Sequence, residues 1–131
     1  MTHHKHAVRT ESAPAPFQGA PYSQGIVSGD LVFVSGQLGI DPAAGQVVAG
    51  GIVEQTEQVM KNLSAILEEA GSGLDDVLMT SIFLVDLQDF QAMNEVYAAH
   101  LSEPYPARAT VQIAALPSGA RIEIAVVARR A

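Results

Sequence analysis

The sequence contains no cysteine and no tryptophan, and charged residues make up only 16% of its 131 positions. The absence of cysteine excludes disulfides and thiol catalysis. Basic residues are also scarce: 7 Lys and Arg stand against 14 Asp and Glu, which gives a formal net charge of −7. A protein that binds nucleic acid needs a basic face to neutralise phosphates, so we expect no nucleic-acid partner.

Long hydrophobic runs are missing as well. No run approaches the roughly 20 apolar residues of a membrane-spanning helix, so we expect no membrane partner. The N-terminal stretch MTHHKHAVRTESAPAP lacks the apolar region of a signal peptide, which favours a cytoplasmic location. The length suits one domain, residues 1–131, and its polar start predicts a flexible tail over residues 1–11.

Hydrophobic periodicity predicts a series of strands and helices. They are a hairpin of 26–27 and 31–34, a helix over 52–70 ended by Gly71, a strand over 75–85, a helix over 86–101, and strands over 108–114 and 121–129. At the start of the second helix, Asp86 and Asp89 have the spacing of a capping box. This order indicates an α+β fold with one sheet and two helices on one of its faces.

The chain is rich in apolar residues, at 48%. In the last strand both alternating sets are apolar, Ile122, Ile124 and Val126 on one side and Ala125 and Val127 on the other. One face of the sheet is left without helices, so a second copy of the sheet has to cover it. We therefore expect an oligomer that is joined sheet to sheet.

Common catalytic motifs are absent: there is no Walker loop, GxGxxG, HExxH or zinc-ligand spacing. The histidines near the N-terminus have no carboxylate partner, so we expect no metal site there. Outside that tract the remaining histidine, His100, lies late in a helix and is interpreted as a surface or capping residue. The apolar stripe of that helix (Leu87, Phe90, Met93, Tyr97 and Leu101) is interpreted as core.

Arg108 and Glu123 break the apolar pattern of the last two strands. An arginine fork suits bidentate capture of a small carboxylate, although Arg108 also fits a strand-end residue that extends to solvent. Glu123 shares a face with Arg121, so a surface ion pair is its alternative. In a hairpin centred on Ser118, Arg108 would lie about five residues, or about 16 Å, from the position opposite Glu123. Two neighbouring chains would be needed to bring both side chains to one ligand.

Several segments together resemble the RidA/YjgF family of imine deaminases. They are APYSQG (20–25), VSGQLGIDPAAGQVV (34–48), EQTEQVMKNLSAILEEAG (54–71), MNEVYAAH (93–100), EPYPARATVQIAALP (103–117) and RIEIA (121–125). The resemblance implies a chorismate-mutase-like fold, with a six-stranded mixed sheet in the order βββαβαββ, two helices on one face, and a homotrimer with sites between subunits. It also implies hydrolysis of 2-imino acids such as 2-iminobutanoate and 2-iminopropanoate to 2-keto acids and ammonium, without a cofactor.

The resemblance assigns roles to individual residues. Arg108 would hold the substrate carboxylate, and Glu123 would position the attacking water. The residues Tyr22, Ser35 and Gly36 would line the pocket. Thr110 stands where many members have Cys or Ser and keeps a hydroxyl there. Ala125 replaces a glutamate that is common in the family.

Three other functions remain open from the sequence. The clefts of a non-catalytic trimer could bind or sense 2-keto acids. The chain could act on a specialised enamine, such as an aminoacrylate derivative. Endoribonuclease activity has been attached to relatives, but the acidic charge and the lack of a catalytic histidine weigh against it.

Overall fold

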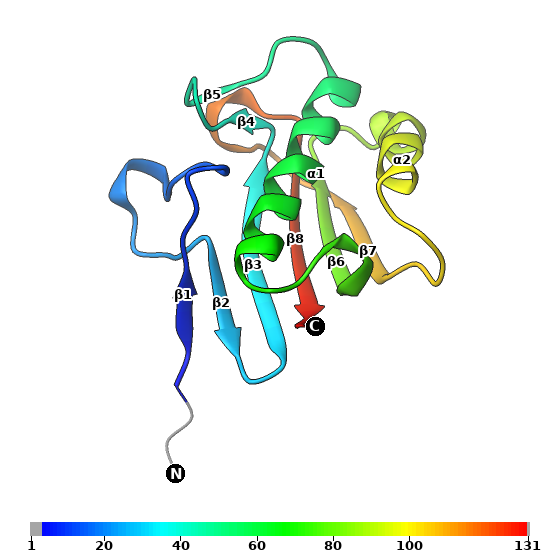
Figure 1. The fold of residues 1–131 in the computed structure, drawn as a ribbon. Helices are drawn as coiled ribbons and strands as arrows, with labels where there is room; N and C mark the ends of the chain where they lie inside the picture. Colours follow the sequence, from blue (N-terminus) through cyan, green and yellow to red (C-terminus); the bar gives the residue numbers. More distant parts are fainter. Residues whose placement is uncertain (1–3, 131) are drawn as a thin grey trace.

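The computed structural model describes residues 4–130 and shows one six-stranded sheet with two α-helices on one face (Figure 1). The helices are α1 (Ile52–Glu69) and α2 (Phe90–Ala99). The strands of this sheet are β1 (His6–Val8), β2 (Gly25–Ser28), β3 (Leu31–Leu38), β6 (Val77–Leu84), β7 (Ala107–Gln112) and β8 (Ile122–Arg129). The strands β4 (Ile40–Asp41) and β5 (Gln46–Val47) form a separate small sheet.

The main sheet has the spatial order β1-β2-β3-β8-β6-β7. The strands β6 and β7 pair in parallel, joined by a crossover through α2, and the other neighbours pair antiparallel. The predicted α+β class, mixed six-stranded sheet and βββαβαββ order are thereby confirmed. The predicted homotrimer remains a prediction.

Two expectations about the sheet were wrong. Residues 6–8, which were assigned to a flexible tail, form β1 and pair with β2; residues 1–3 of that predicted tail lie outside the described residues. The last two strands do not form a hairpin, because β6 lies between β7 and β8. The parallel register of β7 on β6 places β7 at the edge, and β8 becomes a central strand between β3 and β6. A central position explains the apolar character of β8.

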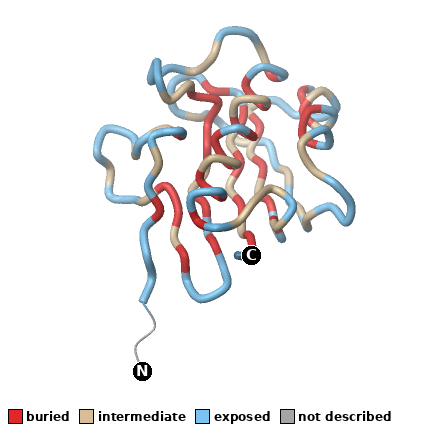
Figure 2. The backbone as a smooth tube through the Cα atoms, viewed as in Figure 1, coloured by how far each residue is buried: buried red, intermediate tan, exposed pale blue. Residues whose placement is uncertain are grey.

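The helix α1 covers the centre of the sheet. Its N-terminus is fixed by Glu54, whose Oε1 accepts a hydrogen bond of 2.8 Å from the Gly51 N–H, and Gly71 follows its end with a φ of 80°. The apolar face of α1 includes Val59, Leu63 and Ile66, each 0% exposed. Figure 2 shows buried residues along the central strands and the helices, and these residues form one hydrophobic cluster, so the core lies between the two layers.

The start of α2 differs from the predicted capping box. Asp86 accepts a hydrogen bond from the Gln88 N–H at 2.9 Å, and α2 itself begins at Phe90 after a short 3₁₀ turn. The carboxylate of Asp89 instead accepts two hydrogen bonds from Arg121, from Nε at 3.1 Å and from Nη2 at 2.9 Å. A bidentate guanidinium–carboxylate pair is stronger than a cap to one N–H. It ties α2 to the start of β8.

Two further side chains have clear partners. The surface pair of Arg121 with Glu123 does not form, because Arg121 is bound to Asp89. His100 ends α2, and its Nε2 lies 2.8 Å from Glu57 Oε2 on α1. It therefore links the two helices at their surface. Neither α1 nor α2, the α-helices of residues 4–130, has the length and apolar character needed to cross a bilayer.

A buried amide fixes the chain between β3 and β4. Asn62 on α1 is 0% exposed, and its Nδ2 donates hydrogen bonds to the carbonyls of Leu38 at 3.1 Å and Ile40 at 2.9 Å. Both carbonyls are thereby satisfied away from water. This contact sets where the end of β3 lies relative to the helix layer.

We predict that Asn62→Ala lowers the free energy of unfolding by about 3 kcal/mol, because it leaves two buried carbonyls without a donor. Urea denaturation measures the change, with Lys61→Ala on the exposed side of α1 as the control. The control should stay within about 0.5 kcal/mol of wild type. Equal destabilisation of the two variants would contradict this role for Asn62.

Candidate functional site

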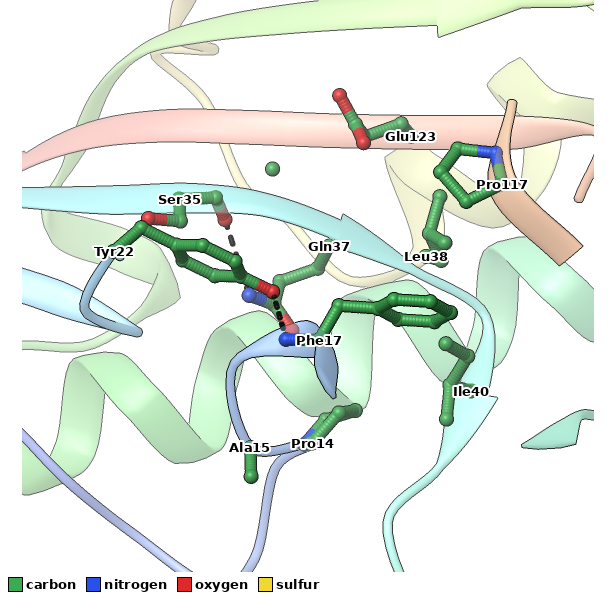
Figure 3. Close-up of a pocket in the computed structure, with 11 residues that line it drawn as sticks. Pro14, Ala15, Phe17, Tyr22, Ser35, Gln37, Leu38, Ile40, Pro117 and Glu123 are labelled. Atoms are coloured by element: carbon green, nitrogen blue, oxygen red, sulfur yellow. Dashed lines mark hydrogen bonds between the residues drawn. The ribbon is translucent and has the colours of Figure 1, made fainter. Parts of the chain in front are cut away.

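A cleft of about 390 Å³ opens beside the end of β3 (Figure 3). It is lined by residues of the loop 14–22, by residues 35–38, and by Ile40, Pro117 and Glu123. Four of the predicted site residues line this cleft: Tyr22, Ser35, Gly36 and Glu123. They come from a loop and two neighbouring strands that the sheet pairing brings together.

Glu123 supplies the negative charge of the cleft. It alternates with the buried residues Ile122 and Ile124, so it projects from the sheet face that the helices do not cover. Its side chain is half-buried, and burial raises the pKa of the Glu123 carboxyl above its ordinary value of 4.5. No Lys, Arg or His among residues 4–130 forms an ion pair with it. An unpaired, partly desolvated carboxylate is suited to accept a proton or to bind a cation.

Gly36 makes room for this carboxylate. A Cβ added at Gly36 would lie 2.6 Å from both Cδ and Oε2 of Glu123. The pairing of β3 with β8 shifts register between Val34 and Gln37, so Gly36 lies in a bulge. The bulge and the missing side chain together let Glu123 lie against the β3 backbone.

Tyr22 and Ser35 shape the polar end of the cleft. The Ser35 hydroxyl donates a hydrogen bond of 2.6 Å to the Ser23 carbonyl. The Tyr22 hydroxyl accepts one of 2.7 Å from the Phe17 N–H, as Figure 3 shows, so its own proton remains available to a ligand. The first bond ties the residue after Tyr22 to β3, and the second holds the loop 14–22 together while leaving the Tyr22 O–H as a donor in the cleft.

Arg108 lies elsewhere. On β7 it pairs with Thr80, whose hydroxyl lies 2.9 Å from the Tyr97 hydroxyl of α2. Its Cζ lies 5.3 Å from the ring centroid of Phe90 and 5.2 Å from that of Tyr97, so the guanidinium stacks under α2. No carboxylate among residues 4–130 forms an ion pair with it. The aromatic rings hold the guanidinium while its N–H fork is left for an anion.

Two buried polar atoms accompany Arg108. The Thr110 hydroxyl oxygen and the Asn94 Oδ1 are buried and have no hydrogen-bond partner among the described residues. Thr110 is two residues along β7 from Arg108, so it shares its face, and Asn94 is four residues after Phe90 on α2. Unsatisfied buried atoms beside an unpaired arginine are typical of a binding site.

Sequence reasoning missed Phe90 and Tyr97 as neighbours of Arg108. The stripe of α2 was interpreted as core, which holds for Met93 and Tyr97, whereas Phe90 is 40% and Leu87 is 45% exposed. The available signal was Asn94 itself, because an amide one helical turn from both Phe90 and Tyr97 interrupts that stripe.

The two groups of residues lie on opposite faces of the sheet. Arg108 pairs with Thr80 and Glu123 pairs with Phe83, which is three residues further along β6. Strand geometry therefore separates them by about 10 Å across the sheet and about 10 Å along it, with the β6 backbone between them. One chain does not bring Arg108 and Thr110 to the cleft of Glu123.

Among residues 4–130, no three His, Asp or Glu side chains gather as a metal site would require.

The fold and cleft define a small α+β protein with an unpaired carboxylate on one sheet face and an unpaired arginine on the other. The family model described as endoribonuclease L-PSP matches residues 10–130. The chain belongs to this family, which is the RidA/YjgF family.

Individual relatives agree with this assignment. A RutC family protein of Saccharolobus solfataricus is 47% identical over 96% of this chain and 98% of its own length. The 2-iminobutanoate/2-iminopropanoate deaminase of Homo sapiens is 44% identical over 89% of this chain and 85% of its own. The crystal structure of RidA from the Antarctic bacterium Psychrobacter sp. has a TM-score of 0.90 at 46% identity, covering 95% of this chain and 98% of that one.

We predict that Glu123→Gln stabilises the protein at neutral pH. Burial raises the folded-state pKa of Glu123 above the unfolded value, so the associated stability is present below the unfolded pKa and is lost as pH rises through the folded pKa. The variant should therefore have the higher denaturation midpoint at about pH 7 to 8, and the two midpoints should converge below about pH 4.

The control for this comparison is Glu95→Gln, which removes an exposed carboxylate of α2. It should show no gain that grows with pH. Midpoints must be compared at equal protein concentration, because association shifts apparent stability. A Glu123→Gln advantage that is independent of pH would contradict the desolvation of this carboxylate.

Proposed function

We propose that this protein hydrolyses reactive 2-imino acids, such as 2-iminobutanoate and 2-iminopropanoate, to 2-keto acids and ammonium. The observation that carries the proposal is the pair of unpaired charges, Glu123 and Arg108. A 2-imino acid is a small molecule with a cationic iminium next to a carboxylate, so it offers one opposite charge to each. The deaminase named in a human relative at 44% identity supports the same chemistry.

The reaction needs little beyond orientation and one base. The protonated imine carbon is already electrophilic, and water adds to it after losing a proton to the Glu123 carboxylate. That proton then passes to the nitrogen, and the C–N bond breaks to release ammonia. The hydroxyl proton is transferred through Glu123 to the ammonia, which gives the carbonyl and ammonium. The raised pKa of Glu123 makes it a better base than an exposed glutamate. In this mechanism the Tyr22 O–H donates a hydrogen bond to the water or to the developing alcohol.

We assign the substrate carboxylate to Arg108 and the hydroxyl of Thr110. Since the sheet separates these residues from Glu123 of the same chain, the complete site consists of Glu123 from one copy and Arg108 from its neighbour. Exposed apolar residues on the uncovered sheet face, Phe33 at 44%, Met79 at 39% and Val111 at 46%, support sheet-to-sheet association. We propose the homotrimer that is implied by the family resemblance, acting in the cytoplasm.

The first experiment follows the loss of 2-iminobutanoate generated in situ by a threonine dehydratase and trapped by semicarbazide. We expect the wild-type protein to suppress trapping and Arg108→Ala to lose about 100-fold in kcat/KM, because the substrate carboxylate loses its charged partner. The control Arg9→Ala removes an exposed arginine of the N-terminal region and should retain full activity.

The oligomeric state of each variant is checked by sedimentation, so that loss of assembly is separated from loss of the arginine. If wild type fails to suppress trapping but binds 2-keto acids saturably, the protein is a sensor or binding module. Cleavage of RNA by nuclease-free protein would favour the endoribonuclease activity in the description of the family model. Either result would overturn the proposed deaminase.

A second prediction concerns Gly36. We expect Gly36→Ala to lower kcat by at least about tenfold, because its Cβ would occupy the place of the Glu123 carboxylate. The acid limb of the pH–rate profile should also move to lower pH as Glu123 is pushed into solvent. Gly73→Ala is the matched control, since its nearest neighbour would be 3.9 Å away. An unchanged pH profile in Gly36→Ala would show that Gly36 does not position Glu123.

A further inference from the structure

The cleft beside Glu123 has two unlike ends (Figure 3). The polar end contains Tyr22 and Ser35. The other end is apolar and is formed by Phe17, Leu38, Ile40 and Pro117. Leu38 is paired with Glu123 across β3 and β8, so the apolar end begins directly beside the carboxylate.

The floor of the apolar end is a hydrophobic cluster separate from the main core. Leu38 and Ile40 pack with Ala120 in this cluster, and they are 8% and 7% exposed. The hydrogen bonds from Asn62 to the carbonyls of Leu38 and Ile40 fix its position. The floor is therefore held rigidly in place and is not part of the main core. A rigid apolar surface of this kind can bind a hydrophobic ligand group.

Phe17 forms the wall of this end. Its side chain is 41% exposed, and its backbone N–H is held by the Tyr22 hydroxyl at 2.7 Å. The same hydroxyl therefore lies at the polar end and fixes the residue that closes the apolar end. A ligand that reaches Glu123 has Phe17 and Leu38 as its nearest apolar neighbours in the cleft.

The apolar end extends beyond what the smallest substrates cover. The cleft of one chain measures about 390 Å³, and the neighbouring copy that brings Arg108 takes part of this space. The side chain of 2-iminopropanoate is a single methyl group, too small to cover Phe17, Leu38 and Ile40 together. With this substrate the apolar end would remain in contact with water, and the hydrophobic gain of covering it would be lost.

We propose that the site selects 2-imino acids with bulky apolar side chains, branched aliphatic or aromatic, and that Phe17 and Leu38 determine this preference. The inference rests on the proposed function and specifies its substrate class. The iminium lies at Glu123, and the side chain extends along Leu38 toward Ile40 and under Phe17. Each methylene buried there raises kcat/KM about threefold to fourfold.

The test compares imines generated by an amino-acid oxidase from alanine, leucine and phenylalanine, with catalase present and with semicarbazide as the trap. The reaction for each is R–C(=NH₂⁺)–COO⁻ + H₂O → R–CO–COO⁻ + NH₄⁺. We expect kcat/KM for the imines from leucine and phenylalanine to exceed that for 2-iminopropanoate by at least about tenfold. The difference should lie mainly in KM, because uniform binding of a remote group lowers KM.

The variant Phe17→Ala should reduce the ratio of kcat/KM for the phenylalanine imine to that for 2-iminopropanoate by about tenfold. Gln18→Asn in the same loop is the control and should leave the ratio unchanged, because Asn tolerates the left-handed backbone found at this position, φ 50°. Hydrolysis of 2-iminopropanoate at least as fast as the bulky imines would overturn this inference and leave the deaminase intact. A ratio unaffected by Phe17→Ala would also overturn it. Hydrolysis of no imine would instead refute the proposed function itself.

Discussion

The alternation of side chains across a β-sheet is the constraint on which the site depends. Thr80 and Phe83 of β6 point to opposite faces, and their partners Arg108 and Glu123 point with them. The proposed anion-binding and proton-accepting groups, Arg108 and Glu123, are thus fixed on two sides of one layer. No side-chain motion brings them together within a chain, because the backbone of β6 lies between them. Association of copies is therefore a requirement of the proposed chemistry as well as a means of covering apolar surface.

Each half of the site is held by a different kind of interaction. Arg108 is positioned by aromatic rings, which attract a guanidinium without occupying its N–H groups. A carboxylate partner would have positioned it as firmly but would have competed with the substrate. Glu123 is positioned by the space that Gly36 leaves at the β3 bulge. A side chain at residue 36 would fill the place that the Glu123 carboxylate occupies. Both arrangements leave a charge unpaired until a ligand arrives.

Local sequence patterns were sufficient for the helices and most strands, but they missed β1 and did not determine how the strands pair. The helix from Ile52 was correctly expected because its apolar period and the following Gly71 are local signals. The position of β7 beside β6 was not expected. The two strands are parallel and are joined through a crossover, so no tight turn in the sequence marks their pairing. Proximity along the chain favoured a hairpin of β7 and β8. The hypothesis of a two-chain site does not depend on that hairpin, because Arg108 and Glu123 project from opposite faces of the sheet.

The same distinction applies to the site. Arg108 and Glu123 could be identified because a charge in an apolar strand is conspicuous in the sequence, and family resemblance added Tyr22, Ser35, Gly36 and Thr110. Asn94 interrupts the apolar stripe of α2 and could have marked this helix, but the sequence does not say which side of α2 faces Arg108, because the docking of α2 on the sheet decides it. The Asp89–Arg121 pair that anchors α2 was also hidden, since Asp89 had a local explanation as a cap.

The proposed site also accounts for release of its product. A 2-imino acid carries an iminium and a carboxylate, so it satisfies Glu123 and Arg108 together. Hydrolysis sends the positive charge away as ammonium and leaves a 2-keto acid, which keeps the carboxylate but no longer offers a cation to Glu123. The half-buried carboxylate then faces a neutral carbonyl oxygen, an acceptor against an acceptor, and binding weakens by the loss of one charge pair. Substrate binding and product release therefore follow from the same unpaired glutamate, without a conformational switch.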